Sequence, residues 1–259
     1  MSEGILCEIR DGIGIVSLSR PERHNAFTQE MHVAFGAAID AMAADPGVRV
    51  ILLRGEGRSF CSGMDVTMIG SRAPGDSDMA YLARLQQVRL KQLDCPKPIV
   101  AALKNAVLGL GCEVALACDF RIAGSDLQLG VPEVAMGLVT DSGGLPLLNA
   151  LIGSARTKYL ILTGRRIDAA TALAWGAVEL VVDSDALDVT ALAIAAEIAA
   201  QPPLAVLAAR RIIDDAARGA IRAGLNAELL AQSALFKSQD YQEARGARRD
   251  GRPSEFGGT

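Results

Sequence analysis

The first two thirds of the chain alternate between β-branched apolar runs and segments with helical periodicity. The runs Gly12–Ser19 and Val48–Leu53 are rich in Ile, Val and Leu, which favours strands. Between them, apolar residues recur every three or four positions at Met31, Phe35, Ile39 and Met42. Thr28 is suited to cap this predicted helix and Asp45-Pro46-Gly47 to end it.

The same unit is then repeated. Residues 81–93 have helical periodicity, and an apolar strand is predicted at residues 98–103. Val48–Leu53 is almost wholly apolar, as is typical of a strand covered on both faces in a parallel sheet. The alternation therefore predicts an α/β fold with mostly parallel pairing.

Beyond Gly153 the sequence becomes rich in alanine and helical in pattern, and Val178–Val182 is the last predicted strand. Pro203–Gln239 is predicted to be helical with few breaks. One apolar stripe on it contains Leu225, Leu229, Leu230 and Phe236. We expect a core with the active site at residues 1–200 and a helical oligomerisation region at residues 201–259.

Composition indicates a soluble globular protein of 259 residues, of which 50% are hydrophobic and 22% charged. The net charge of −4 argues against a nucleic-acid partner, and the basic residues 245–252 indicate a solvated helix face rather than an anion site. No apolar run approaches the roughly 18 residues that a membrane span needs. With no leader pattern at the N-terminus, we expect a cytoplasmic location.

Cysteine and histidine usage limits the available chemistry. Five cysteines, an odd number without C-x-x-C spacing, indicate buried free thiols rather than disulfides or a zinc site. His24 and His32 are the two histidines, so we expect no metal site, and chemistry is expected to rest on carboxylates.

The segment Pro98–Pro146 gathers the candidate chemistry. Gly109-Leu110-Gly111 lies between a predicted strand and helix, where unpaired N–H groups favour an anion. Two features argue against a dinucleotide-binding turn: Val114 occupies the third glycine position, and Glu133 follows Pro132 instead of ending a strand. Glu113 and Glu133 lie among apolar residues, and a buried carboxylate needs a partner or a role in proton transfer. Together they predict proton transfer at a carbon next to a carbonyl held by the N–H groups.

Seven segments, taken as a set, resemble the ordered motifs of the enoyl-CoA hydratase/isomerase (crotonase) superfamily. They are Arg20-Pro-Glu-Arg-His-Asn-Ala26, Ser59-Phe-Cys-Ser-Gly-Met-Asp65, Lys97-Pro-Ile-Val-Ala-Ala102, Gly109-Leu-Gly-Cys-Glu-Val-Ala-Leu-Ala-Cys-Asp119, Val131-Pro-Glu133, Asp141-Ser-Gly-Gly144 and Leu162-Thr-Gly-Arg-Arg-Ile167. The resemblance implies a spiral of ββα repeats with a C-terminal helical region that forms trimers, often paired into hexamers. It also implies an acyl-CoA thioester substrate and no metal or redox cofactor.

Site roles follow from the same resemblance. The backbone N–H groups of Met64 and Leu110 would form an oxyanion hole, and Glu113 and Glu133 would be the acid and base. Substrate-binding positions carried over in this way are Asn25, Ala26, Ser62, Gly63, Asp65 and Gly109.

Three positions depart from the family pattern. Leu110 replaces a glycine and is expected to add bulk at the mouth of the oxyanion site. Asn105 replaces a glycine that needs positive φ, which asparagine tolerates. Asp141 stands where typical hydratases have glycine, and either an N-cap for the following helix or a catalytic role fits it.

These residues favour an enoyl-CoA hydratase, which adds water reversibly to a 2-enoyl-CoA thioester. The alternative is an enoyl- or dienoyl-CoA isomerase, or a carnitinyl-CoA dehydratase-like enzyme, that uses Asp141. A non-catalytic acyl-CoA-binding relative is the third possibility, and retention of both glutamates argues against it.

Overall fold

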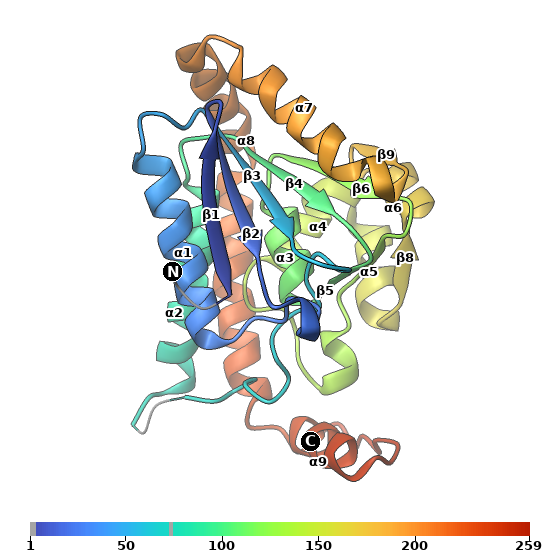
Figure 1. Ribbon diagram of the computed structural model, residues 1–259. Helices are drawn as coiled ribbons and strands as arrows, with labels where there is room; N and C mark the ends of the chain where they lie inside the picture. Colours follow the sequence, from blue (N-terminus) through green and yellow to red (C-terminus); the bar gives the residue numbers. More distant parts are fainter. Residues whose placement is uncertain (1–3, 73–74) are drawn as a thin grey trace.

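The structure is a computed structural model that describes residues 4–72 and 75–259 (Figure 1). Its strands form two sheets. The large sheet contains β1 (Ile5–Arg10), β2 (Ile13–Leu18), β3 (Val50–Gly55), β4 (Ile99–Leu103), β6 (Phe120–Gly124) and β9 (Leu180–Val182), in that spatial order. The small sheet contains β5 (Ala106–Leu108), β7 (Gln128–Gly130) and β8 (Arg166–Asp168).

The large sheet confirms the predicted parallel arrangement. Strands β2, β3, β4, β6 and β9 pair in parallel, and β1 alone runs antiparallel, to β2. The apolar pattern does not predict β1, which forms the edge of the sheet and is largely exposed. Cys7 lies on this edge strand and is exposed, so the prediction that the cysteines are buried is wrong for Cys7 and confirmed for the other four.

Alternate residues of the strands pack against different helices. Ile13, Val50 and Val100 face α7 (Leu187–Ala199), which covers one side of the large sheet. Val16 and Ile51 belong to the other and larger core, which also includes α1 (Gln29–Ala44) and α3 (Leu110–Leu116). The apolar run of β3 is therefore buried on both faces, as its sequence predicted.

The remaining helices complete these layers. They are α2 (Asp78–Leu93), α4 (Gly144–Ile152), α5 (Ser154–Thr163), α6 (Ala169–Trp175), α8 (Pro203–Leu235) and α9 (Gln239–Asp250). The predicted start of α1 is confirmed, because Thr28 Oγ1 accepts a hydrogen bond from the N–H of Met31.

The predicted helical stretch Pro203–Gln239 is confirmed almost throughout, because α8 spans Pro203–Leu235. The chain breaks between α8 and α9, where the side chain of Ser238 caps α9 by accepting from the N–H of Tyr241. On α8, Leu225 is buried, whereas Leu230 is 62% exposed and so leaves the predicted stripe. The long α8 helix runs behind the sheet in Figure 1, and α9 lies at its lower end.

The small sheet determines where the candidate site forms. Strands β5 and β7 are parallel, and Leu108 pairs with Gly130. The turn at Gly109 and the 3₁₀ helix Glu133–Met136 therefore leave the same edge of this sheet. Asn105, just before β5, has φ 46°, which confirms the positive φ expected there.

Within the described residues, no single helix is both long and apolar enough to cross a membrane. The segment Ser184–Ala199 and α8 satisfy that test only as a pair, and they are bent by 105° at their junction.

Candidate active site

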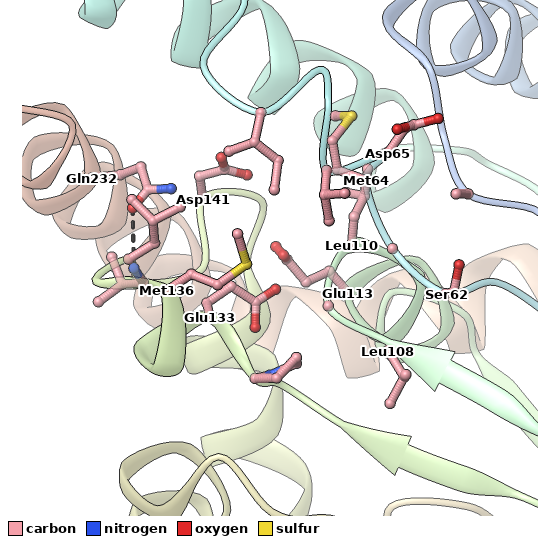
Figure 2. Close-up of a pocket in the computed structure, with 18 of the residues that line it drawn as sticks. Ser62, Met64, Asp65, Leu108, Leu110, Glu113, Glu133, Met136, Asp141 and Gln232 are labelled. Atoms are coloured by element: carbon pink, nitrogen blue, oxygen red, sulfur yellow. Dashed lines mark hydrogen bonds between the residues drawn. The ribbon is translucent and has the colours of Figure 1, made fainter. Parts of the chain in front are cut away.

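A cavity of about 440 Å³ lies at the edge of the small sheet, between α2, α3 and the far end of α8 (Figure 2). Every predicted site residue except Asn25 lines it. The structure thus brings together residues from five separate sequence motifs. Further residues line the cavity that the sequence motifs do not indicate.

Two glycine turns meet at this cavity. Gly63 has φ 106°, and a β-carbon on it would lie 3.0 Å from the carbonyl oxygen of Leu108 and 3.6 Å from the nitrogen of Leu110. Only glycine therefore suits this position. Leu110 is the first residue of α3, so its N–H has no acceptor within the helix. Among the described residues, neither this N–H nor that of Met64 makes a hydrogen bond, which leaves two adjacent donors for a ligand oxygen.

Glu113 lies in the first turn of α3 and is 2% exposed. Its Oε2 accepts a 2.7 Å hydrogen bond from the N–H of Ser142. Burial and the nearby carboxyl of Asp141 raise the pKa of Glu113 well above its usual range, although the guanidinium of Arg89 opposes this. Glu113 is therefore protonated more readily than an ordinary glutamate.

Glu133 begins the 3₁₀ helix that follows β7, and its carboxylate points into the cavity (Figure 2). Its Oε2 is buried and has no hydrogen-bond partner within residues 4–72 and 75–259. Burial raises the pKa of Glu133 to about 7. A buried acceptor without a partner is costly, so this oxygen is suited to bind a ligand.

Asp141 does not cap α4, and that hypothesis from the sequence is wrong. The cap residue of α4 is Gly143, and the oxygens of Glu228 on α8 accept from the N–H groups of Gly143 and Leu145 at 2.7 and 2.8 Å. The Asp141 carboxylate instead accepts from Ser142 Oγ at 3.0 Å and lines the cavity. Burial raises its pKa to about 6.

Asn25 is fully buried and stabilises a loop instead of lining the cavity. Its Nδ2 donates to the carbonyl oxygens of Glu56 and Ser59, and its Oδ1 accepts from the N–H of Arg20. The loop that it holds leads into Ser62–Asp65, which do line the cavity together with Ala26. Asn25 therefore acts on the site through its neighbours.

The side chain of Leu110 is 6% exposed and packs into the larger core while one side lines the cavity. Leu110 therefore does add bulk beside the N–H groups of the proposed oxyanion site, although most of its side chain is buried. Tyr81 and Phe236 line another part of the cavity, and the ring of Phe236 makes tilted contacts with the rings of Tyr81 and Tyr241. These residues belong to an apolar cluster.

Three arginines that the sequence motifs do not indicate also line the cavity. Arg23, Arg166 and Arg248 come from three different elements, and each is exposed. In the part of the chain that is described, none of them pairs with a carboxylate. Arg248 belongs to the basic tail, for which a solvated face was predicted. The four arginines close together in that segment could have indicated an anion-binding role.

Buried polar residues on two helices also contribute to the site, and the sequence motifs do not indicate them. Arg89 on α2 is fully buried, and its Nε donates to the carbonyl oxygen of Ser142 at 3.1 Å. Glu228 and Gln232 on α8 follow Leu225 at helical spacing, and all three are buried. A charged or amide residue on a buried helix face was the signal that could have revealed them.

The arrangement combines two free N–H donors with three carboxyl groups in one cavity. Such donors stabilise negative charge that develops on an oxygen, and carboxyl groups with raised pKa values can both give and take protons near neutral pH. Within residues 4–72 and 75–259, no group of three His, Cys, Asp or Glu side chains is arranged to hold a metal ion.

Comparison with known proteins assigns this arrangement to a family. The family model for enoyl-CoA hydratase/isomerase matches residues 8–258. The chain is 32% identical over 255 residues to a probable enoyl-CoA hydratase of Rhizobium meliloti, with 98% of each chain covered. It is 31% identical to the 1,2-epoxyphenylacetyl-CoA isomerase of Escherichia coli, with 94% of each chain covered.

A solved structure shows the same fold. An enoyl-CoA hydratase/isomerase from Xanthobacter autotrophicus Py2 superposes with a TM-score of 0.87 at 36% identity, and the match covers 97% of this chain and 95% of that one. Relatives with both hydratase and isomerase names match at similar identity.

Proposed function

The chain belongs to the enoyl-CoA hydratase/isomerase family, and on that premise we propose that it adds water reversibly to the double bond of a 2-enoyl-CoA thioester. One observation carries the proposal. The carboxylate of Glu133, with its unpartnered Oε2, lies against the Gly109 turn that presents the free N–H of Leu110. A proton-transfer group and an oxyanion donor thus share one reacting position.

The proposed reaction begins with the thioester oxygen between the N–H groups of Met64 and Leu110. Glu133 takes a proton from water, and the hydroxide oxygen forms a bond to C3 of the enoyl group. The electrons of the double bond move onto the thioester oxygen, where the two N–H groups stabilise the enolate. Glu113 then gives its proton to C2, and the hydroxyacyl thioester forms.

The different surroundings of Glu113 and Glu133 support their assignment as acid and base. The pKa of Glu113 is raised well above its usual range by burial, which suits a proton donor. The pKa of Glu133 is raised by burial to about 7, so a substantial fraction is ionised at neutral pH and can act as base. Two carboxyl groups with different proton affinities are what a hydration needs. The proposal assigns no step to a metal or redox group.

The cavity mouth supports a CoA ester as substrate. Arg23, Arg166 and Arg248 provide positive charge there, and the phosphates of CoA are the chemical partners that such arginines bind well. The apolar lining near Tyr81 and Phe236 suits the acyl group.

Isomerisation of a double bond is the second candidate, and the position of Asp141 favours it. Because Glu228 caps α4, the Asp141 carboxylate faces the cavity as a third group for proton transfer. An isomerase would move one proton between two carbons through the same enolate and add no water.

The test is an assay of enoyl-, dienoyl- and ring-acyl-CoA thioesters in water and in deuterium oxide, followed by mass spectrometry. Hydration predicts a product heavier by one water. Isomerisation predicts deuterium in the product without added water. If no thioester in the panel changes, the protein is a non-catalytic binder and the proposal is wrong.

A further inference from the structure

Where α8 contacts the segment 139–145, polar side chains of the helix hydrogen-bond to backbone N–H groups of the segment. The buried positions of this 33-residue helix are Leu225, Glu228 and Gln232. Two of the three carry polar side chains, and both hydrogen-bond to the segment that contains Asp141. A helix whose role was packing alone would place apolar groups at these positions.

Glu228 holds that segment at three points. One carboxylate oxygen accepts from the N–H of Gly143, and the other accepts from the N–H of Leu145 and from Thr140 Oγ1. Gly143 has φ 97° and makes no side-chain cap of its own. The first turn of α4 therefore depends on a carboxylate from a helix more than 80 residues away.

Gln232, one helical turn later, holds the N-terminal half. Its Oε1 accepts from the N–H of Val139 at 3.0 Å, the bond drawn in Figure 2. Gln232 and Asp141 both line the cavity, and the Gln232 amide partly opposes the rise that burial causes in the pKa of Asp141. From α2, Gln86 Nε2 donates to the carbonyl oxygen of Asp141 at 2.9 Å.

We propose that Glu228 and Gln232 are positioning residues, through which α8 fixes the Asp141 carboxylate and the N–H of Ser142 that Glu113 accepts. This inference rests on the proposed function, because it concerns the residues that position the carboxyl groups of that site. Ser142 follows Asp141 directly, and its N–H lies 2.7 Å from Glu113 Oε2. A shift of this segment therefore misplaces two of the three carboxyl groups at once.

The charged and titratable groups around Asp141 affect its pKa, so a test based on its titration must leave them unchanged. The titratable and charged groups near it come from α2 (Tyr81 and Arg89), α3 (Glu113), the 3₁₀ helix (Glu133) and α8 (Glu228). Gln232 is neutral, so its replacement leaves all these charges in place. An altered titration of Asp141 then reports the loss of the Gln232 amide and of the bond by which it holds Val139.

The experiment compares Gln232→Met, Glu228→Gln and Glu228→Asp with the control Asp215→Asn. Met keeps the length of Gln232 without its hydrogen bonds, and Gln at 228 replaces one acceptor oxygen by a donor that faces an N–H. Asp keeps both acceptor oxygens. Asp215 is an exposed carboxylate of the same helix, so its change to Asn matches the Glu228 change chemically.

Two readouts separate this proposal from the proposed function. Carboxyl ¹³C NMR of labelled aspartate should place the Asp141 titration at higher pH in Gln232→Met, whether or not any thioester reacts. On the best thioester, kcat should fall about 10- to 100-fold in Gln232→Met and Glu228→Gln, with KM within about threefold and partial recovery in Glu228→Asp. An unshifted Asp141 titration, or a kcat equal to that of Asp215→Asn in folded variants, would overturn the proposal.

Discussion

A β-carbon placed on Gly109 would lie 2.7 Å from Oε1 of Glu133, closer than non-bonded atoms approach. The carboxylate of Glu133, the proposed base, therefore lies directly against Gly109, the first residue of the oxyanion turn. Gly109 has φ 52° as well, so both its missing side chain and its backbone conformation are needed.

The first prediction concerns this contact. Gly109→Ala should displace the Glu133 carboxylate and strain the turn, with a loss of about 10²-fold in kcat because reacting groups are misplaced. Gly219→Ala is the matched control. Gly219 lies in α8 with open space around its Cα, so the change should leave kcat unchanged. Equal turnover in the two variants would contradict the assignment of the turn.

The second prediction separates hydration from isomerisation. If hydration uses Glu113 and Glu133 alone, Asp141→Asn should lower kcat less than tenfold, while Glu133→Gln lowers it about 10²- to 10⁴-fold by removing an acid–base group. In an isomerase that uses Asp141, its amide variant should be as damaging as Glu133→Gln. Steady-state kinetics of both variants on the same thioester distinguish the two reactions.

The third prediction is a fall in stability as pH rises. Burial raises the pKa of Glu133 and Glu228 to about 7 and that of Asp141 to about 6. The native protein thus retains protons that the unfolded chain releases near pH 4, so the free energy of unfolding decreases between pH 5 and pH 8.

Thermal unfolding across this pH range checks the sign. Wild-type Tm should be lower at pH 8 than at pH 5, and Glu133→Gln should flatten the dependence because its amide does not titrate. A Tm that rises over this range in the wild type would show that the three carboxyl groups are solvated.

The fourth prediction concerns assembly, which we propose to be a trimer or a dimer of trimers. The N-terminal half of α8 exposes large apolar side chains, with Leu204 81%, Ile212 73% and Ile213 72% exposed. Such a surface marks an interface. Light scattering should give three or six times the 27.1 kDa of one chain, and Ile212→Glu/Ile213→Glu should lower that mass. A monomeric wild type at micromolar concentration would contradict this proposal.

The sequence predicted the parts of the site that local chemistry determines. The Gly109 turn, Glu113 in a first helical turn and Glu133 after Pro132 all depend on neighbours within a few residues, and the structure places each on the cavity. The cap of α4 could not be predicted in this way. It is supplied by Glu228, which is distant in sequence, so Asp141 was left with two possible roles.

The same limit explains the other differences. Asn25 matched a motif at a substrate-binding position, yet its hydrogen bonds to Glu56 and Ser59 form only when two loops meet. Strand β1 lies at the sheet edge, where exposed residues weaken the apolar pattern. Arg248 reaches the cavity because α9 packs beside the 3₁₀ helix, a contact that helical periodicity does not encode.

The most direct test of the central claim is hydration of crotonyl-CoA by the wild type and by Glu113→Gln/Glu133→Gln, followed by the loss of enoyl absorbance. The wild type should form the 3-hydroxyacyl thioester. The double variant should fold with a wild-type far-UV spectrum and lose at least about 10³-fold in kcat, since both proposed proton-transfer groups are removed. Wild-type hydration by the double variant would leave the mechanism without its base and its acid, and would contradict it.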